Sequence, residues 1–249
     1  MTEEETSTRI ERAGSASARR KRSTLLFLRD LLVIFLVAVL VSFLIKTFLI
    51  RSFFIPSASM EQTLVQDDRI IVNQLVPDLA PIQHGDVVVF QDPGGWLPAR
   101  DDPSQPPLIA AVDWFLAFVG LSAPDSNDHL VKRVIGLPGD HVVCCNALGQ
   151  MSVNGVPLDE QPYVALPPGT TKVSELDFDV TVPDESLWVM GDNRYNSKDS
   201  RYNGGTPLEG YVPVDNVVGR AFVVSWPISH WAWLDNYPSV FDGVEEASG

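Results

Sequence analysis

Cysteine is scarce in this sequence, and basic residues are scarce over most of its length. The two cysteines among the 249 residues, Cys144 and Cys145, are adjacent, so they form neither a disulfide framework nor a zinc-site spacing. Because a bond between neighbouring cysteines is strained, we expect two thiols. From residue 52 onward there are nine Lys/Arg against 27 Asp/Glu. A segment this acidic is not expected to bind nucleic acid, whose phosphates demand a basic surface.

Familiar catalytic signatures are missing too. None of the four histidines lies in a recognisable triad context; they are His84, His129, His141 and His230. No Gly-x-Ser-x-Gly turn, which carries the nucleophile of α/β-hydrolases, is present. The EF-hand spacing of a calcium loop is also absent. A serine nucleophile in this chain would therefore need a base other than histidine.

Long hydrophobic runs are concentrated near the N-terminus. Residues 1–23 contain almost no large apolar side chain, which predicts a disordered tail. The run 31–50 supplies the ~20 residues of a membrane-spanning helix if Lys46 extends its amine towards the headgroups. We predict a transmembrane signal-anchor helix over 24–51. A basic cluster precedes it, so the positive-inside rule places residues 1–23 in the cytoplasm and residues 52–249 outside.

Two other interpretations of this run stay open. A cleavable signal peptide would have small residues at its cleavage site, as Ser57-Ala58-Ser59 does. A soluble protein could instead bury such a helix in its core. The run is longer than a signal-peptide core, and Lys46, Arg51 and two phenylalanines follow it. These features favour an uncleaved anchor.

After the anchor, the pattern is that of short strands separated by Gly and Pro. Strand candidates are residues 69–73, 85–90, 129–135, 142–145, 151–153, 187–190 and 217–226. Asn154-Gly155 is the signal of a two-residue hairpin turn. Since no long amphipathic helix accompanies these segments, they predict an all-β domain over 52–249.

Two apolar segments do not fit this pattern. The fourteen residues Leu108–Leu121 are too few to span a bilayer, so we expect either a helix packed on the domain or a segment dipping into the outer leaflet. Trp231, Trp233 and Tyr237 near the C-terminus suit either packing or an aromatic belt at a membrane interface.

Ser59 is the candidate nucleophile. It lies nine residues beyond Ile50, so it stays within ~30 Å of the predicted helix end. Ala58 leaves room for a substrate backbone, and Ser57 could donate to an oxyanion beside the Ser59 N–H. Two serines after a membrane helix also fit an inert, solvated turn.

Lys132 is the candidate base. Its apolar neighbours predict a buried strand, and burial lowers the pKa of a lysine towards the range in which the neutral amine accepts protons. A solvent-facing position is the alternative.

A polar cluster over 191–201 follows another strand. There, Asp199 and Arg201 share a face if extended, and Ser197 could hydrogen-bond a lysine; an ordinary polar turn is the alternative.

Four blocks stand in one order behind the apolar run. They are Pro56–Met60 with Thr63-Leu64, Gly85–Phe90, Lys132–Asp140 and Gly191–Arg201. In this combination the chain resembles bacterial type I signal peptidase (leader peptidase), a membrane-anchored Ser/Lys endopeptidase that removes signal peptides from exported proteins.

The resemblance implies a role for each matched residue. It makes Ser59 the acylated nucleophile, Lys132 the general base and Ser57 the oxyanion donor beside the Ser59 N–H. The implied supporting residues are Asp192, Ser197 as the serine that orients the lysine, and the ion pair of Asp199 and Arg201. No metal ion and no organic cofactor is required.

The resemblance also implies fold and partners. The fold would be an all-β extracytoplasmic domain of antiparallel sheets behind one transmembrane helix, with a non-catalytic β subdomain at 141–185 and an apolar surface against membrane lipid. The substrates would be exported preproteins with small residues at the first and third positions before the cut. Gln62 stands where the family usually has proline. A processing peptidase with a narrow substrate set and a non-catalytic surface scaffold are the alternatives.

Overall fold

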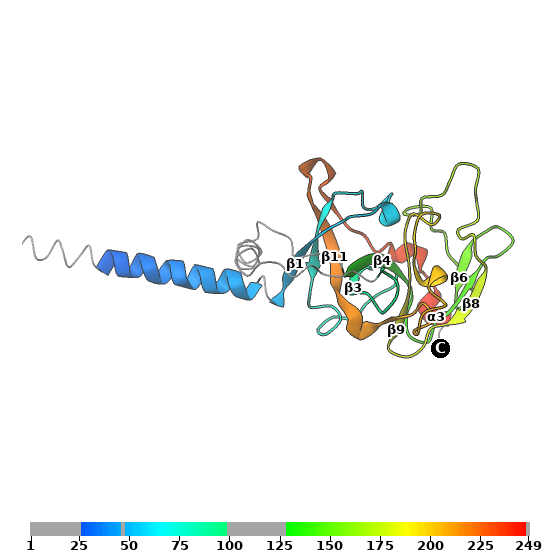
Figure 1. The fold of residues 1–249 in the computed structure, drawn as a ribbon, viewed down its shortest axis with the longest axis horizontal. Coiled ribbons are helices and arrows are strands. Elements are labelled where there is room, and N and C mark those ends of the chain that lie inside the picture. Colours follow the sequence, from blue (N-terminus) through cyan, green and yellow to red (C-terminus); the bar gives the residue numbers. More distant parts are fainter. Residues whose placement is uncertain (1–25, 46–47, 99–127, 248–249) are drawn as a thin grey trace, which may run out of the picture. The chain divides into compact units, whose positions relative to one another are not determined.

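The computed structural model describes residues 26–45, 48–98 and 128–247 (Figure 1). The chain divides into two compact units, with the boundary between Thr47 and Phe48. The predicted tail 1–23, Lys46 and the apolar segment 108–121 lie outside the described residues.

The first unit contains a helix over Leu26–Ile45. Its 20 residues have a mean hydropathy of 2.6, and of the described residues this is the one helix long and apolar enough to cross a membrane. The predicted end at residue 51 is wrong, because strand β1 begins at Ile50. Phe53 of this strand is 1% exposed, so its burial against the β domain outweighs the helical pattern before it.

The second unit is built on an eight-stranded antiparallel sheet. Its path is β1-β2-β11-β3-β4-β9-β10, with β12 paired to β11. The bounds are β1 Ile50–Phe54, β2 Arg69–Asn73, β3 Val87–Gln91, β4 His129–Gly136, β9 Ser186–Met190, β10 Val212–Pro213, β11 Val217–Trp226 and β12 Ala232–Trp233. Two strands of this sheet, 69–73 and 217–226, have the predicted bounds, as does 151–153 in the second sheet.

Both faces of the sheet are buried at its centre. Val87 and Val89 of β3 pack in one apolar cluster, while Val88 and Phe90 pack in another. Alternate residues of a strand point to opposite faces, so a continuous apolar run such as Val87–Phe90 suits a central strand covered on both sides.

A four-stranded antiparallel sheet lies at the other end of the domain from β1 (Figure 1). Its order is β7-β6-β5-β8, with bounds β5 His141–Cys144, β6 Met151–Val153, β7 Val156–Pro157 and β8 Phe178–Thr181. The predicted hairpin is confirmed: β6 and β7 pair around Asn154 and Gly155, whose φ angles are 52° and 81°. Positive φ at both positions is what a type I′ turn requires.

Short 3-10 helices and one helical turn connect these strands. They are η1 Ala58–Met60, η2 Ser200–Tyr202, η3 Val214–Asn216, η4 Ile228–His230, η5 Pro238–Val240 and α3 Val244–Ala247.

At the end of β5 the sulfurs of Cys144 and Cys145 are bonded to each other, so the expectation of two thiols is wrong. Cys144 is buried in the core that the second sheet shares with Trp188.

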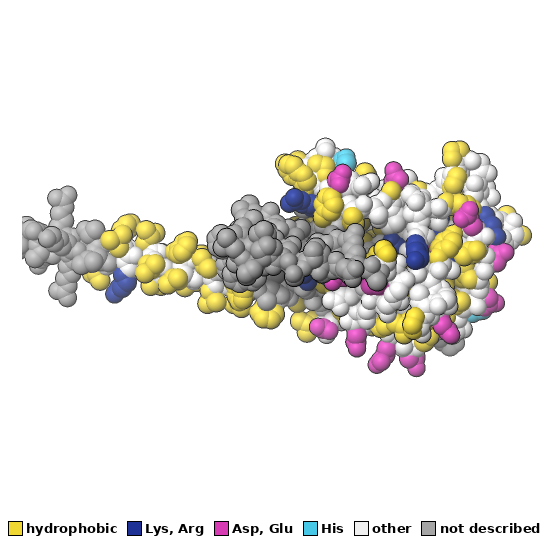
Figure 2. All heavy atoms as spheres, in the orientation of Figure 1, with side chains coloured by type: hydrophobic (Ala, Val, Ile, Leu, Met, Phe, Trp, Pro, Cys, Tyr) yellow, Lys and Arg dark blue, Asp and Glu magenta, His cyan; other side chains and the backbone are white. Residues whose placement is uncertain are grey.

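An apolar ridge projects from the loop after β11. We define it as Trp226, Ile228, Trp231 and Trp233, which are 55%, 76%, 55% and 67% exposed. Figure 2 shows hydrophobic side chains gathered at this tip. Strand β12 pairs Trp233 with Val223, so the ridge is held by backbone hydrogen bonds.

Candidate active site

Ser59 lies on η1, in the loop between β1 and β2. Backbone hydrogen bonds close the base of this loop, from Ile55 N to Asp68 O and from Asp67 N to Ile55 O, both 2.9 Å. Met60 inserts into the core and is 1% exposed. The buried methionine holds the turn down while Ser59, beside it, stays half-buried at the surface.

Lys132 lies on β4, and its side chain reaches Ser59. The residue is 4% exposed. Its Nζ donates to Ser59 Oγ at 2.8 Å and to Val131 O at 3.0 Å. The predicted burial of this lysine is therefore confirmed, and the solvent-facing alternative is wrong. The carbonyl of Val131 orients the amine, and the strand brings it across 73 residues of sequence to the serine.

Burial lowers the pKa of Lys132 from its usual 10.5 to about 8. The carboxylates of Asp199 and Asp192 oppose this effect by stabilising the ammonium form, and the Arg201 guanidinium reinforces it. At pH 7 about one lysine in ten is then neutral, against fewer than about one in a thousand for an exposed lysine.

Ser57 is the exposed N-cap residue of η1. Its Oγ donates to Ser59 Oγ at 3.3 Å. The structure therefore brings Ser57, Ser59 and Lys132 together, with both neighbours directed at the same oxygen.

Asp199 and Arg201 form the predicted ion pair. Arg201 Nε and Nη2 donate to the Asp199 carboxylate at 2.8 and 2.7 Å, and both side chains are fully buried. The backbone is a turn rather than a strand, since Asp199 caps η2 and accepts from Arg201 N. Asp199 also accepts from Gly191 N at 2.9 Å, which ties the pair to the end of β9.

Ser197 is buried, but its Oγ has no hydrogen-bond partner among the described residues. The expected bond to Lys132 is not formed, because the lysine amine is directed at Ser59 and Val131. Ser197 packs on Gly191, where an added Cβ would overlap both Ser197 Oγ and Ser59 O. Only glycine at this position lets the 191–201 segment approach the turn that carries Ser59 so closely.

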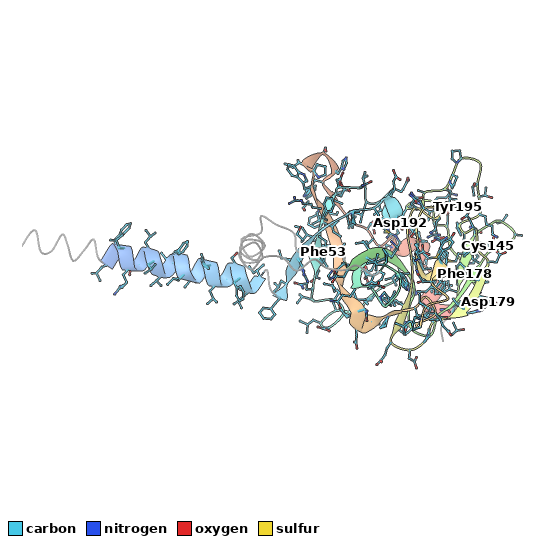
Figure 3. The ribbon with its side chains drawn as sticks, viewed as in Figure 1. Phe53, Cys145, Phe178, Asp179, Asp192 and Tyr195 are labelled. Carbon is cyan, nitrogen blue, oxygen red and sulfur yellow. A yellow bond between two sulfur atoms is a disulfide. The ribbon has the colours of Figure 1, made fainter. Side chains whose placement is uncertain are left out.

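Asp192 belongs to a buried network that the sequence reading did not specify. Arg133 donates to its carboxylate at 2.9 and 2.8 Å, and Thr63 donates to it as well. Arg133 also donates to Gly85 O at 2.6 Å. Asp192 lies within the β domain (Figure 3). All four residues of this network lie in the four sequence blocks described above. Their place in those blocks was the sequence signal that could have pointed to the network.

Glu160 and Arg194 form a second pair that the sequence reading missed. Arg194 Nη1 and Nη2 donate to the two carboxylate oxygens at 2.8 and 2.6 Å, and both side chains are buried. Ala165 N then donates to Asp192 O at 2.9 Å. The segment around 160–165 thus holds the 191–201 block in place, and no sequence motif indicated this contact.

No hydrogen bond among the described residues joins a histidine to Ser59 or Lys132. Three histidines bond to aspartates instead: His84 to Asp140, His141 to Asp179 and His230 to Asp68. No described group of three His, Cys, Asp or Glu side chains is arranged to hold a metal ion.

The comparisons with known proteins agree with the sequence blocks. The chain matches the family described as signal peptidase, peptidase S26, over residues 28–226. A probable signal peptidase I of Mycobacterium leprae is 40% identical over 96% of this chain and 89% of its own. Signal peptidase I of Mycobacterium tuberculosis is 40% identical over 85% and 76%.

A crystal structure of signal peptidase I from Enterococcus faecalis V583 also matches. It is 24% identical and covers 56% of this chain and 95% of its own, with a TM-score of 0.35, too low to compare residues. The sequence matches are sufficient by themselves: this chain belongs to the signal peptidase family, peptidase S26.

Proposed function

We propose that this protein removes N-terminal signal peptides from exported preproteins, with Ser59 as nucleophile and neutral Lys132 as general base. Family membership supports the reaction class. The observation that carries the assignment of residues is the 2.8 Å contact between Lys132 Nζ and Ser59 Oγ, made by a lysine that is 4% exposed. A solvated lysine would be protonated at neutral pH and would have no lone pair to offer.

In the proposed first step, neutral Lys132 accepts the Ser59 proton while Ser59 Oγ attacks the scissile carbonyl. The new ammonium group then gives its proton to the departing amine, and an ester links the signal peptide to Ser59. In the second step Lys132 takes a proton from water, which attacks the ester. The ammonium returns that proton to Ser59 Oγ as the acyl–oxygen bond breaks, and the signal peptide leaves as a carboxylic acid that ionises in water. Lysine thus ends each cycle neutral, and the serine regains its proton.

The oxyanion of each tetrahedral intermediate would accept from Ser59 N–H and from Ser57 Oγ after that hydroxyl turns away from Ser59. Asp192, Ser197, Asp199 and Arg201 would act as supporting residues. The Asp199–Arg201 pair holds Gly191 and the block against the nucleophile turn, and Asp192 holds Thr63 of the same loop. The buried hydroxyl of Ser197, which forms no hydrogen bond with Lys132 in this structure, would restrict the lysine amine during proton transfer.

The helix Leu26–Ile45 would anchor the enzyme in the cytoplasmic membrane, with the N-terminus in the cytoplasm and the β domain outside. The basic residues before the helix support this orientation. The preferred preproteins would carry small residues at the first and third positions before the cut, and the apolar ridge would contact membrane lipid.

A variant series tests the proposed dyad on a membrane-inserted precursor. Ser59→Ala should abolish cleavage. Lys132→Met should lower kcat/KM by about 10²–10⁴-fold, the usual contribution of a general base. Methionine fills similar volume without a buried charge, so this variant should still fold, as a thermal melt will report. Lys172→Met is the matched control, because the Lys172 side chain is 40% exposed and pairs with Asp177.

The proposed dyad fails if folded Lys132→Met cleaves the precursor at the rate of the Lys172→Met control. Cleavage by Ser59→Ala would exclude Ser59 as nucleophile in the same way.

A further inference from the structure

Glu61 is a charged residue on the nucleophile turn that the reaction described above does not use. It is the C-cap of η1 and is exposed. It follows Ser59 by two residues, so the two Cα atoms are within about 7 Å of each other. A substrate bound at Ser59 therefore passes close to this carboxylate.

The other carboxylates near the dyad are neutralised by arginine. The three buried pairs are Asp192 with Arg133 at 2.8 Å, Glu160 with Arg194 at 2.6 Å and Asp199 with Arg201 at 2.7 Å. Glu61 forms no salt bridge in the described part of the chain, and its hydrogen bond comes from the uncharged amide of Asn193, at 3.3 Å. Since the working form of Lys132 is neutral, Glu61 leaves a net negative charge at the site.

Asn193 fixes the position of this charge relative to Ser59. The same Nδ2 that donates to Glu61 donates to Ala58 O at 3.1 Å. The backbone N of Asn193 donates to Ser59 O at 3.1 Å. One residue thus holds both the nucleophile turn and the carboxylate, so the charge is held beside the reacting atoms rather than on a free side chain.

We infer that Glu61 is a specificity residue, which favours substrates carrying Lys or Arg within two residues of the scissile bond and disfavours Asp or Glu there. The inference rests on the proposed role of Ser59. An extended substrate advances about 3.3 Å per residue, so only nearby positions reach Glu61. An exposed ion pair changes affinity by roughly two- to fivefold. Replacing a substrate Lys, which Glu61 attracts, by a Glu, which it repels, enlarges this change in affinity to roughly three- to tenfold.

The test uses the full-length enzyme and peptides that differ by one residue. Lys, Gln or Glu is placed in turn at the second position before the cut and at the first two positions after it. At the positions that face Glu61, kcat/KM of the wild type should be roughly three- to tenfold higher for Lys than for Glu, mainly through KM. Salt should reduce the ratio, because it screens exposed charges.

Charge variants separate Glu61 from the overall acidity of the domain. Glu61→Gln should bring the Lys/Glu ratio close to one, and Glu61→Lys should reverse it at the same positions. Asp184→Lys makes the same change in net charge at an exposed site between β8 and β9, and should keep the wild-type ratio.

The inference is overturned if wild type and Glu61→Lys rank the peptides identically, or if Asp184→Lys changes the ranking as much as Glu61→Lys does. Ser59→Ala is run beside them. If it is inactive while the ranking ignores Glu61, the inference about Glu61 fails alone; if it cleaves the peptides, the proposed function fails.

Discussion

At the scale of single residues, the protonation of Lys132 should control the rate. Because burial lowers its pKa to about 8, kcat/KM should fall about tenfold per pH unit below pH 8 and level off above it. The rate rises with pH because Lys132 can act as a base only after its amine has lost a proton. A pH series on a soluble peptide measures this, with the Lys172→Met control expected to give the same curve.

Two alternative profiles would contradict this account. A midpoint near 10.5 would mean that burial does not lower the pKa of the catalytic lysine. A midpoint near 6.5 would point to a histidine base, which the geometry does not provide, because no described histidine is hydrogen-bonded to Ser59.

The sequence was informative at the residue scale wherever a side chain carries its own physical signature. Lys132 among apolar neighbours predicted a buried amine, and the alternation of Asp199 and Arg201 predicted their ion pair. Glu160 offered no such signature, because its partner Arg194 is 34 residues away and only the folded chain brings them together. That the Ser197 hydroxyl has no partner among the described residues also depends on sub-ångström packing, which residue types do not encode.

At the scale of elements, the nucleophile turn has an unusual backbone at Gln62. Its φ is +96°, whereas proline is restricted to about −65°. Gln62→Pro, which introduces the family's usual residue, should therefore displace the turn, cost about 3 kcal/mol and lower kcat/KM more than tenfold. Thr63 follows directly and donates to Asp192, so a displaced turn separates the Ser59 loop from the catalytic block. A thermal melt and peptide kinetics measure both effects.

Gln62→Gly is the matched control for the turn. Glycine adopts positive φ without strain but loses more entropy on folding, so its unfolding free energy should stay within about 1 kcal/mol of the wild type. If Gln62→Pro were as stable and as active as Gln62→Gly, the positive φ at this position would be wrong.

Elements were predictable where their signals are local. Residues 154–155 form a hairpin turn through their own φ preferences, and 217–226 forms a strand through its apolar alternation. Strand β1 was missed because Ile50–Phe54 continues the apolar helix in composition, and only pairing with β2 separates the two. Strand β8 was missed because Phe178–Thr181 is defined by its pairing with β5, from which it is distant in sequence.

At the scale of the whole molecule, two features expose apolar side chains that water does not favour. The helix Leu26–Ile45 has every side chain exposed, and the apolar ridge exposes three tryptophans and an isoleucine on the β domain. The rest of the domain is strongly acidic and is repelled by anionic lipid surfaces. Among the described residues of the β domain, contact with lipid should therefore be confined to the ridge, whose tryptophans are typical of membrane interfaces.

This contact can be separated from catalysis with two substrates. The full-length double variant Trp231→Ala/Trp233→Ala should cleave a precursor in lipid vesicles about thirtyfold less efficiently, because each of the two lost indoles removes about 1 kcal/mol of apolar burial. The same variant should cleave a short soluble peptide at the wild-type rate, since the ridge forms no described hydrogen bond with Ser59 or Lys132. Leu148→Ala is the matched control, because Leu148 is 73% exposed and lies outside the ridge. Equal losses on both substrates would show that the ridge supports the fold rather than the membrane contact. No loss on either substrate would contradict the proposed lipid contact of the ridge.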